Sequence, residues 1–338
     1  VRTAVGCFRR HGKECAMSNE QDRVRAMLYQ TPEHIPIRLG VLPAAWMKYR
    51  EQLAALSERH PLLFGRGRRD FDQIWSPTYA EGRHVDAWGC VWENVKHGME
   101  SIVTHHPVPT RRDVHSLKPP GRDVGLPHGF MYLRLCDLRG FEEAMVDFAE
   151  EPPELQMLID VVLEYNLRQV DNRLAELRGK EPQIVGFGDD LGMQTSLPMS
   201  PEKWRKYLKP CYAKLYGRVR DAGHWVYMHT DGHIWEIIPD LVECGVNVIN
   251  PQIRANGLDN LVRVCKGKVC VDLDLDRQMF PFCKPSDIDP HVREAVEALG
   301  APEGGLWLTA ECAPDVPLET IEALCLALEK YRDYFRKS

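Results

Sequence analysis

The second half of the sequence alternates short β-rich runs with amphipathic helical stretches. The runs are rich in β-forming residues, and nearly all of them end in Asp, His, Asn, Gln or Glu. Strands that alternate with helices form βαβ units, whose strands are parallel. Polar residues at the carboxyl ends of successive parallel strands are typical of the active face of a (β/α)8 barrel. The runs are 184–190, 225–231, 246–252, 269–276 and 305–312.

The helical stretches between these runs carry start and stop signals. Ser200 and Pro201 form an N-cap followed by a proline in the first turn, and Gly223 stands where a C-terminal glycine belongs. Pro239 lies inside the stretch that follows the second run, which predicts a kink or a late helix start there. The run 153–179 has apolar residues at helical spacing and predicts one long helix.

A doubly wound Rossmann sheet is the alternative to a barrel. It needs a GxGxxG turn, and the candidate GFGDDLG at 186–192 lacks that spacing. The sequence therefore predicts the α/β class with a (β/α)8 TIM barrel as one domain over 17–338, with an irregular insertion around 100–130. Residues 1–16 are expected to be a disordered extension, with Met17 as the natural start.

Charge and composition narrow the functional class. The 338 residues carry 43 Lys+Arg and 49 Asp+Glu, and a net charge of −6 argues against a nucleic-acid partner. No apolar run approaches the roughly 18 residues that a membrane span needs, and the basic cluster 66–69 is interpreted as a solvated turn. Eleven cysteines without a CxxC pair, and a start without an apolar signal core, predict reduced thiols and a cytoplasmic location.

His229 and Asp231 are the most informative pair of residues. They lie two positions apart on a predicted strand, so their side chains leave the same face. A histidine beside a carboxylate can bind a divalent metal or act as an oriented acid–base pair, and a structural hydrogen bond is the alternative. With Glu311 and Cys312, which end the last run, they would form a zinc site of mixed N, O and S ligands. Cys312 could equally be a small buried residue.

Other polar strand ends could hold a substrate or cap the helices that follow them. Asp189 and Asp190 are neighbours, so only one of them should face the barrel mouth. Trp88 and Trp92, with Asp86, could wall a substrate pocket or pack in the core. The predicted catalytic residues are His229, Asp231, Asp190 and Asp276, and the predicted substrate-binding residues are Asp189, Gln194, Trp88, Trp92, Tyr227, Asn250 and Gln252.

Several segments resemble, in the same order, the uroporphyrinogen decarboxylase superfamily. The resemblance runs from about Met17 to the C-terminus and implies a single (β/α)8 barrel with its site at the carboxyl ends of the strands. The segments are EQDRVRAMLYQTPEHIPI (20–37), MSPEKWRKYLKPCYAKLY (199–216), HTDGHIWEIIPDLVECGVNVINPQ (229–252), PSDIDPHVREAVEALG (285–300) and DVPLETIEAL (315–324).

Each branch of this superfamily has its own sequence motif, and this chain matches those motifs only in part. The decarboxylases that act on uroporphyrinogen carry an RQAGR motif, and the matching stretch 36–46 lacks both arginines. The cobalamin-dependent methyltransferases bind zinc through His-x-Cys and a distant Cys. His229 matches their histidine, Asp231 replaces the first cysteine, and Ala310 stands at the second, two residues before Cys312. The chain most resembles unassigned members with HxDG.

Three functions follow from this resemblance. The first is metal-assisted methyl transfer between a small methylated substrate and a corrinoid protein or thiol, with zinc and a corrinoid on the partner as cofactors. The second is a metal-free decarboxylase or lyase acting on a small carboxylated substrate, but not on the porphyrin. The third is a non-catalytic accessory protein that binds a corrinoid or tetrapyrrole. For the oligomeric state, a homodimer is the expectation that we carry forward.

Overall fold

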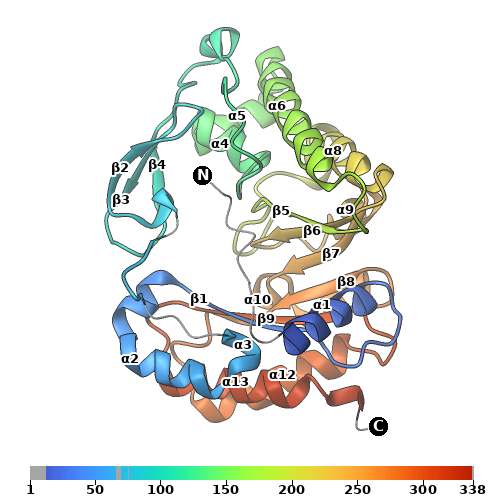
Figure 1. The fold of residues 1–338 in the computed structure, drawn as a ribbon. Helices are drawn as coiled ribbons and strands as arrows, with labels where there is room; N and C mark the ends of the chain where they lie inside the picture. Colours follow the sequence, from blue (N-terminus) through green and yellow to red (C-terminus); the bar gives the residue numbers. More distant parts are fainter. Residues whose placement is uncertain (1–12, 66–69, 75, 337–338) are drawn as a thin grey trace. The chain divides into compact units, whose positions relative to one another are not determined.

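The computed structural model describes residues 13–65, 70–74 and 76–336, with the backbone alone for 13–19. The chain divides into two compact units, which we describe separately (Figure 1). The predicted turn 66–69 and residues 1–12 of the predicted extension lie outside the described residues. The first unit comprises residues up to 81, 94–100 and 252–338, and the second comprises 82–93 and 101–251.

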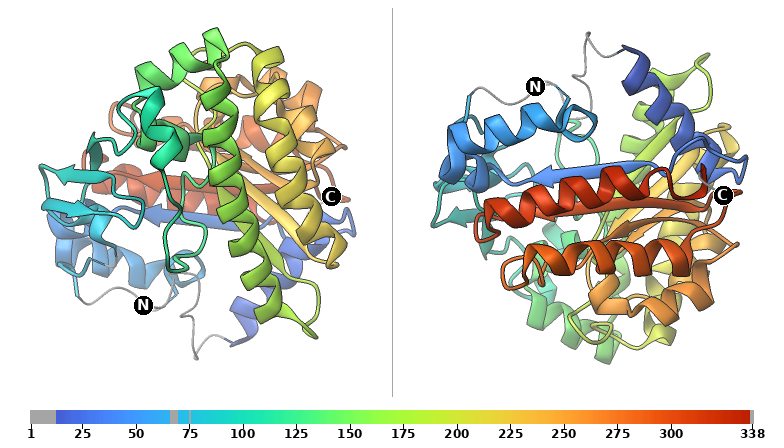
Figure 2. Two further views of the ribbon diagram at one scale, coloured as in Figure 1. Left: turned by 90° about the horizontal axis from the view of Figure 1, so that it is seen from above. Right: turned by 90° about the horizontal axis from the view of Figure 1, so that it is seen from below.

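Three parallel strands form the centre of the second unit. β5 (Ile184–Gly188) pairs with β6 (Trp225–Thr230), and β6 pairs with β7 (Val246–Pro251), so three predicted runs are confirmed as strands. α6 (Pro153–Leu177) and α8 (Lys209–Asp221) lie side by side (Figure 2, left). The other helices of this unit are η2 (Arg111–Ser116), α4 (Tyr132–Arg139), α5 (Phe141–Glu150), α7 (Pro201–Tyr207) and α9 (Ile238–Glu243).

The predicted helix signals of this unit are confirmed. The Ser200 side chain accepts a hydrogen bond from the Lys203 amide at 3.3 Å and so caps α7. Pro239 falls in the first turn of α9, which is the late start that the sequence offered. Gly223 follows α8 with φ of +81°, the left-handed conformation that ends many helices.

A small antiparallel sheet also belongs to this part of the chain. Its strands are β2 (Gly82–Val85), β3 (Val91–Asn94) and β4 (Ile102–His105), in the order β2-β3-β4. The predicted irregular segment 100–130 therefore contributes one strand. β2 and β4 are four residues long and mostly exposed, so the sequence shows no period of two there.

The first unit also has three parallel strands. β9 (Leu306–Cys312) pairs with β1 (Ile37–Val41) on one side and with β8 (Cys270–Asp274) on the other, which confirms the last two predicted runs. α12 (Pro285–Leu299) and α13 (Leu318–Tyr331) lie side by side (Figure 2, right). The other helices are α1 (Lys13–Met27), α2 (Pro43–Arg59), α3 (Pro61–Phe64), η1 (Pro77–Tyr79), α10 (Ile253–Asn256), α11 (Leu258–Cys265) and η3 (Tyr334–Arg336).

Burial of the strands explains why the sequence pattern predicted them. Every residue of β8 is buried, and so are all residues of β9 except Glu311. Parallel strands that are covered on both faces carry mostly apolar residues, and the polar exceptions in β8, Asp272 and Asp274, are themselves buried. Within the part of the chain that the structure describes, no helix is both long and apolar enough to cross a bilayer.

The loops that follow β5 and β6 are held against each other by backbone contacts. The Gly192 amide donates to the Asp231 carbonyl at 3.2 Å, and the His233 amide donates to the Met193 carbonyl at 2.8 Å. Gly232 has φ of +84°, and a Cβ there would overlap the backbone of Gly192. Two glycines thus allow two backbones to touch, and this contact fixes the loops that carry Asp190 and Asp231.

We predict that Gly232→Ala destabilises the protein by about 2–4 kcal/mol. About 1 kcal/mol comes from the left-handed backbone, and steric overlap adds the remaining ~1–3 kcal/mol. Gly223→Ala is the matched control, because Gly223 also has positive φ (+81°) but open space around it. Urea unfolding should show the smaller loss for Gly223→Ala, and equal losses would contradict the close-approach argument.

Candidate functional site

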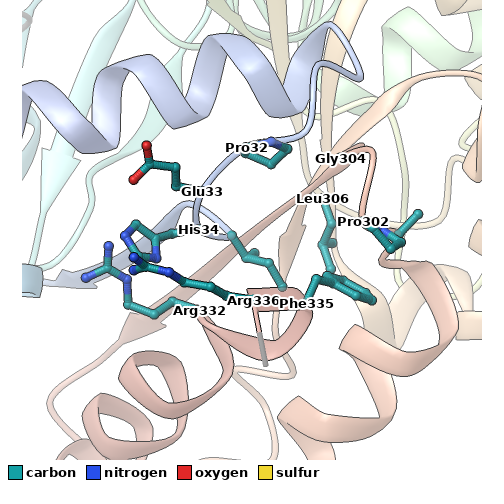
Figure 3. Close-up of a pocket in the computed structure, with 11 residues that line it drawn as sticks. Pro32, Glu33, His34, Pro302, Gly304, Leu306, Arg332, Phe335 and Arg336 are labelled. Carbon is teal, nitrogen blue, oxygen red and sulfur yellow. The ribbon is translucent and has the colours of Figure 1, made fainter. Parts of the chain in front are cut away.

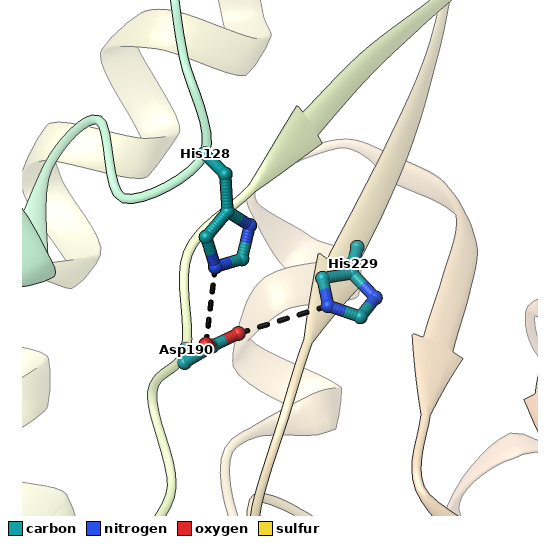
Figure 4. Close-up of side chains that lie close together, drawn as sticks. All are labelled: His128, Asp190 and His229. Atoms are coloured by element: carbon teal, nitrogen blue, oxygen red, sulfur yellow. Dashed lines mark hydrogen bonds and ion pairs between the residues drawn. The ribbon is translucent and has the colours of Figure 1, made fainter. Parts of the chain in front are cut away.

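Side chains from the ends of β5 and β6 meet a histidine from the loop that precedes α4 (Figure 4). His128 Nε2 lies 3.0 Å from Asp190 Oδ2. His229 Nε2 lies 3.7 Å from Asp190 Oδ1 and 3.4 Å from Asp231 Oδ1. We call these four residues the His/Asp cluster. It brings together three predicted catalytic residues and one histidine that was not predicted. The donor atoms of His128, Asp190 and His229 all lie within 4.8 Å of one another and could hold a metal ion.

Pairing between β6 and β7 orients His229. The register places Asn250 beside His229, and His229 Nδ1 lies 2.6 Å from Asn250 Oδ1. An amide oxygen only accepts hydrogen bonds, so Nδ1 carries the hydrogen. In the neutral ring Nε2 then has its lone pair available, and in the protonated ring Nε2 carries a proton that faces Asp190 and Asp231. Asn250, predicted to bind substrate, is placed as the partner that fixes the tautomer of His229.

Opposite charges shift the pKa values of His128 and Asp190. Partial burial lowers the pKa of His128, but the hydrogen bond and charge of Asp190 outweigh it and raise that pKa to about 9. Burial raises the pKa of Asp190, yet the His128 hydrogen bond, with the charges of His128 and His229, brings it below its ordinary value. His128 and Asp190 thus form an ion pair at neutral pH.

Asp189 has a different role from its neighbour. It is fully buried, and its carboxylate accepts hydrogen bonds from the amides of Met131 (3.2 Å), Tyr132 (2.6 Å) and Leu133 (2.9 Å). The Tyr212 hydroxyl donates a fourth bond at 2.6 Å. A carboxylate with four donors and no exposed surface caps α4 and has no capacity for a substrate, so the predicted substrate-binding role of Asp189 is corrected.

The predicted tryptophan cluster is organised around Asp86. Asp86 Oδ2 accepts from Trp92 Nε1 at 3.1 Å and from Arg134 at 2.6 Å, while Asp86 Oδ1 accepts from the Trp88 amide at 2.9 Å. Trp88 is buried and packs edge-on against Tyr165, with ring centroids 5.0 Å apart. Both tryptophans thus take part in packing, which was the alternative to a pocket wall.

Asp137 competes with Asp86 for the same cation. Its Oδ2 lies 3.5 Å from Arg134 Nη1, which is closer to Asp86. Burial raises the pKa of Asp137 from 3.8 to about 7, since the attraction of Arg134 offsets only part of the lost solvation. Asp137 therefore ionises in the folded protein only near neutral pH.

We predict that Asp137→Asn has a larger free energy of unfolding than the wild type above about pH 7, where the buried Asp137 is ionised. Because the pKa of Asp137 is higher in the folded than in the unfolded protein, its contribution to stability is fully present below about pH 4. This contribution is lost as the pH rises through about 7. The variant should therefore exceed the wild type by about 1–3 kcal/mol at pH 8 and by little at pH 4.5 in urea unfolding. Asp123→Asn should have the opposite sign, because Gln169 and Arg168 lower the pKa of Asp123. A pH-independent difference for Asp137→Asn would contradict the argument.

Three predicted substrate-binding residues and the predicted catalytic residue Asp276 lie in different places. Tyr227 is half-buried on the same face of β6 as His229, and Gln194 is exposed in the loop after β5. Gln252 and Asp276 belong to the first unit. Gln252 accepts from Asn256 at the start of α10. Asp276 pairs with Arg254 at 2.8 Å and accepts from two backbone amides of the next turn, so it holds a turn after β8.

Glu311 and Cys312 lie on β9 in the first unit and point to opposite faces of the strand. Glu311 is bonded to Arg277 at 2.8 Å. Cys312 is fully buried, and burial, with a smaller effect from Cys325 of α13, raises the pKa of its thiol well above the ordinary value. Because Glu311 and Cys312 face opposite sides of β9, they cannot both bind one ion, so the predicted mixed zinc site does not fit. The buried Cys312 agrees with the alternative of a small packing residue.

A cavity in the first unit lies at the amino end of β9 (Figure 3). Its lining includes Glu33, His34, Leu306, Arg332 and Phe335. Leu306 is the first residue of β9, whereas barrel sites lie at the carboxyl ends of strands. None of the predicted site residues lines this cavity.

His128 is the site residue that sequence reasoning missed. It lies in the irregular segment 100–130, where no periodicity marks a functional position. Its place depends on contacts to β5, because the Gly129 amide donates to the Gly188 carbonyl at 2.8 Å. The only local signal was a histidine next to a proline and a glycine, in the sequence PHG just before α4.

Comparison with known proteins gives the family. No curated protein sequence matches the chain. Among solved structures, a B12-independent methionine synthase from Shewanella sp. W3-18-1, in complex with selenomethionine, is 10% identical over 76% of this chain and 75% of that chain, with a TM-score of 0.38. A dihydropteroate synthase from Xanthomonas albilineans with 4-aminobenzoic acid is 17% identical over 44% of this chain, with a TM-score of 0.30; the match spans about half of that protein, 53%. Similarities this weak carry no argument.

The family model described as uroporphyrinogen decarboxylase (URO-D) matches residues 134–331. This range is more than half of the chain and includes β5 to β9. It agrees with the parallel strands and helices of both units, and the predicted (β/α)8 barrel class is confirmed. The chain belongs to the uroporphyrinogen decarboxylase (URO-D) family.

Proposed function

We propose that this chain is a URO-D family enzyme that moves a methyl group between a small methylated substrate and a corrinoid protein or a thiol. The observation that supports this most is the setting of His229. Its Nδ1 is fixed by Asn250, and its Nε2 faces Asp190 at 3.7 Å and Asp231 at 3.4 Å. The site thus has an oriented imidazole between two carboxylates at the ends of β5 and β6.

Methyl transfer from a heteroatom creates a charge that such a site can meet. The bond between the methyl carbon and the heteroatom breaks, and its electron pair stays on the heteroatom. The methyl carbon bonds to the thiolate sulfur or to reduced cobalt on the partner. The heteroatom then needs a proton or a cation, and a protonated His229 can deliver a proton from Nε2. Asp190 and Asp231 attract positive charge to the same point.

The acidic surroundings bear on substrate choice. The cluster has two carboxylates, and His128 is its paired cation. Such a site disfavours substrates with several carboxylates, which agrees with the missing arginine motif in 36–46. A neutral or cationic methylated alcohol, amine or thioether fits it better.

Decarboxylation of a small carboxylate is the second candidate. It is favoured by the family description and by the His128–Asp190 pair, which places a second proton donor in the cluster. In that reaction the bond to the carboxylate carbon breaks, CO2 leaves, and the electron pair on the remaining carbon takes a proton from a histidine.

The test is a turnover assay on the full chain. Donors labelled with 13C in the methyl group are mixed with reduced cobalamin or a thiol, and NMR follows the methyl signal. We expect transfer with at least one donor and a loss of about 100-fold or more in His229→Ala, as for removal of a general acid. His115→Asn is the control, because His115 is an exposed residue of η2.

Other outcomes would overturn the proposal. Release of CO2 from a carboxylated substrate, without methyl transfer from any donor, would favour the decarboxylase. Tight binding of cobalamin or a porphyrin without any turnover would indicate the accessory protein. Equal turnover of His229→Ala and His115→Asn would remove the His/Asp cluster from the mechanism.

A further inference from the structure

We infer that His128, Asp190 and His229 bind one divalent transition-metal ion through two nitrogens and one carboxylate, and that Gly188 and Asn250 build this site. The ligand set differs from a thiolate set, since no cysteine takes part. The inference deepens the proposed function, because it names the cation at the same cluster. Its test measures metal binding without substrate, so the two can fail separately.

The spacing of the three donors suits one ion. Ligand atoms about 2.1 Å from a zinc ion stand roughly 3.4 Å apart in a tetrahedral site. The two distances to the Asp190 carboxylate, 3.0 Å from His128 and 3.7 Å from His229, lie on either side of that value (Figure 4). Small movements of the side chains would therefore bring all three to a common ion.

The orientation of His229 is already that of a ligand. Metal-bound histidines donate their second ring N–H to a fixed acceptor, which sets the tautomer. Asn250 Oδ1 is that acceptor at 2.6 Å, so in the neutral ring the lone pair of Nε2 is available to a metal ion and faces Asp190. Asn250 thus acts as a positioning residue.

Gly188 makes room for His128. A Cβ on Gly188 would stand 2.6 Å from His128 Nδ1, well inside contact distance. The same residue accepts the Gly129 amide at 2.8 Å and so holds the loop that carries His128. Any other side chain at position 188 would push the imidazole away from Asp190. Gly186, two residues earlier on β5, has open space around the same position.

The donor types and the exposure indicate the class of ion. Two imidazoles and a carboxylate suit zinc or iron(II), whereas magnesium and calcium prefer oxygen ligands alone. About half of the His128 side chain is exposed (49%), and Asp190 and His229 are partly exposed. Positions on the ion would therefore stay open to a substrate. The charge of the ion would balance Asp190 and Asp231.

The experiment titrates the chelator-treated full chain with Zn2+ by calorimetry, with Mg2+ in parallel and Co2+ as a spectroscopic probe. We expect one Zn2+ per chain that depends on the cluster, visible Co2+ d–d bands, and no comparable Mg2+ binding. Gly186→Ala and His115→Asn should bind Zn2+ like the wild type. Gly188→Ala, His128→Asn and His229→Ala should lose affinity, and Asn250→Leu should lose about 10–100-fold.

Several results would overturn the inference. These are no Zn2+ binding by the wild type, unchanged affinity in His229→Ala or His128→Asn, and equal affinity in Gly188→Ala and Gly186→Ala. Circular dichroism and thermal unfolding check that each variant is folded. If Gly188→Ala does not fold, His128→Asn decides, because it removes the ligand without changing β5. Methyl transfer by a wild-type protein that binds no Zn2+ would overturn the inference and keep the proposed function. Zn2+ binding without methyl transfer from any donor would keep the inference and overturn the proposed function.

Discussion

One buried carboxylate, that of Asp189, connects the end of β5 to the segment that carries His128. It accepts three amide hydrogen bonds from Met131, Tyr132 and Leu133, at the start of α4, and a fourth from Tyr212. A buried carboxylate is costly unless its oxygens are fully bonded. This requirement fixes α4 against β5 and so sets the position of His128, three residues before the first of these amides.

The neighbouring carboxylate shows how one step along the chain changes the chemistry. Burial raises the pKa of Asp189, while His128 and His229 help to bring the pKa of Asp190 below its ordinary value. Adjacent side chains leave an extended backbone on opposite sides, so one reaches the cap and the other reaches the histidines. A carboxylate that caps α4 and a carboxylate of the His/Asp cluster thus stand side by side.

The success of the sequence predictions followed burial. The runs at 269–276 and 305–312 are mostly apolar because β8 and β9 are covered on both faces, and this pattern is visible without a structure. The pairing of His229 with Asp231 followed from the strand period alone. The prediction that Glu311 and Cys312 bind one ion was wrong, because neighbouring residues on a strand face opposite sides. Only the tertiary structure shows that Cys312 is the buried one of the two.

The sequence by itself determined the α/β class, the polar strand ends and the family, since these depend on local periodicity and on motifs that are contiguous in the chain. Only the tertiary structure decided that Asp189 caps a helix, that Asn250 orients His229, and that His128 joins the cluster. These relations connect residues 21 to 62 positions apart. They arise from strand register, from the bonding needs of a buried charge and from the space left by Gly188, none of which has a local signature in the sequence.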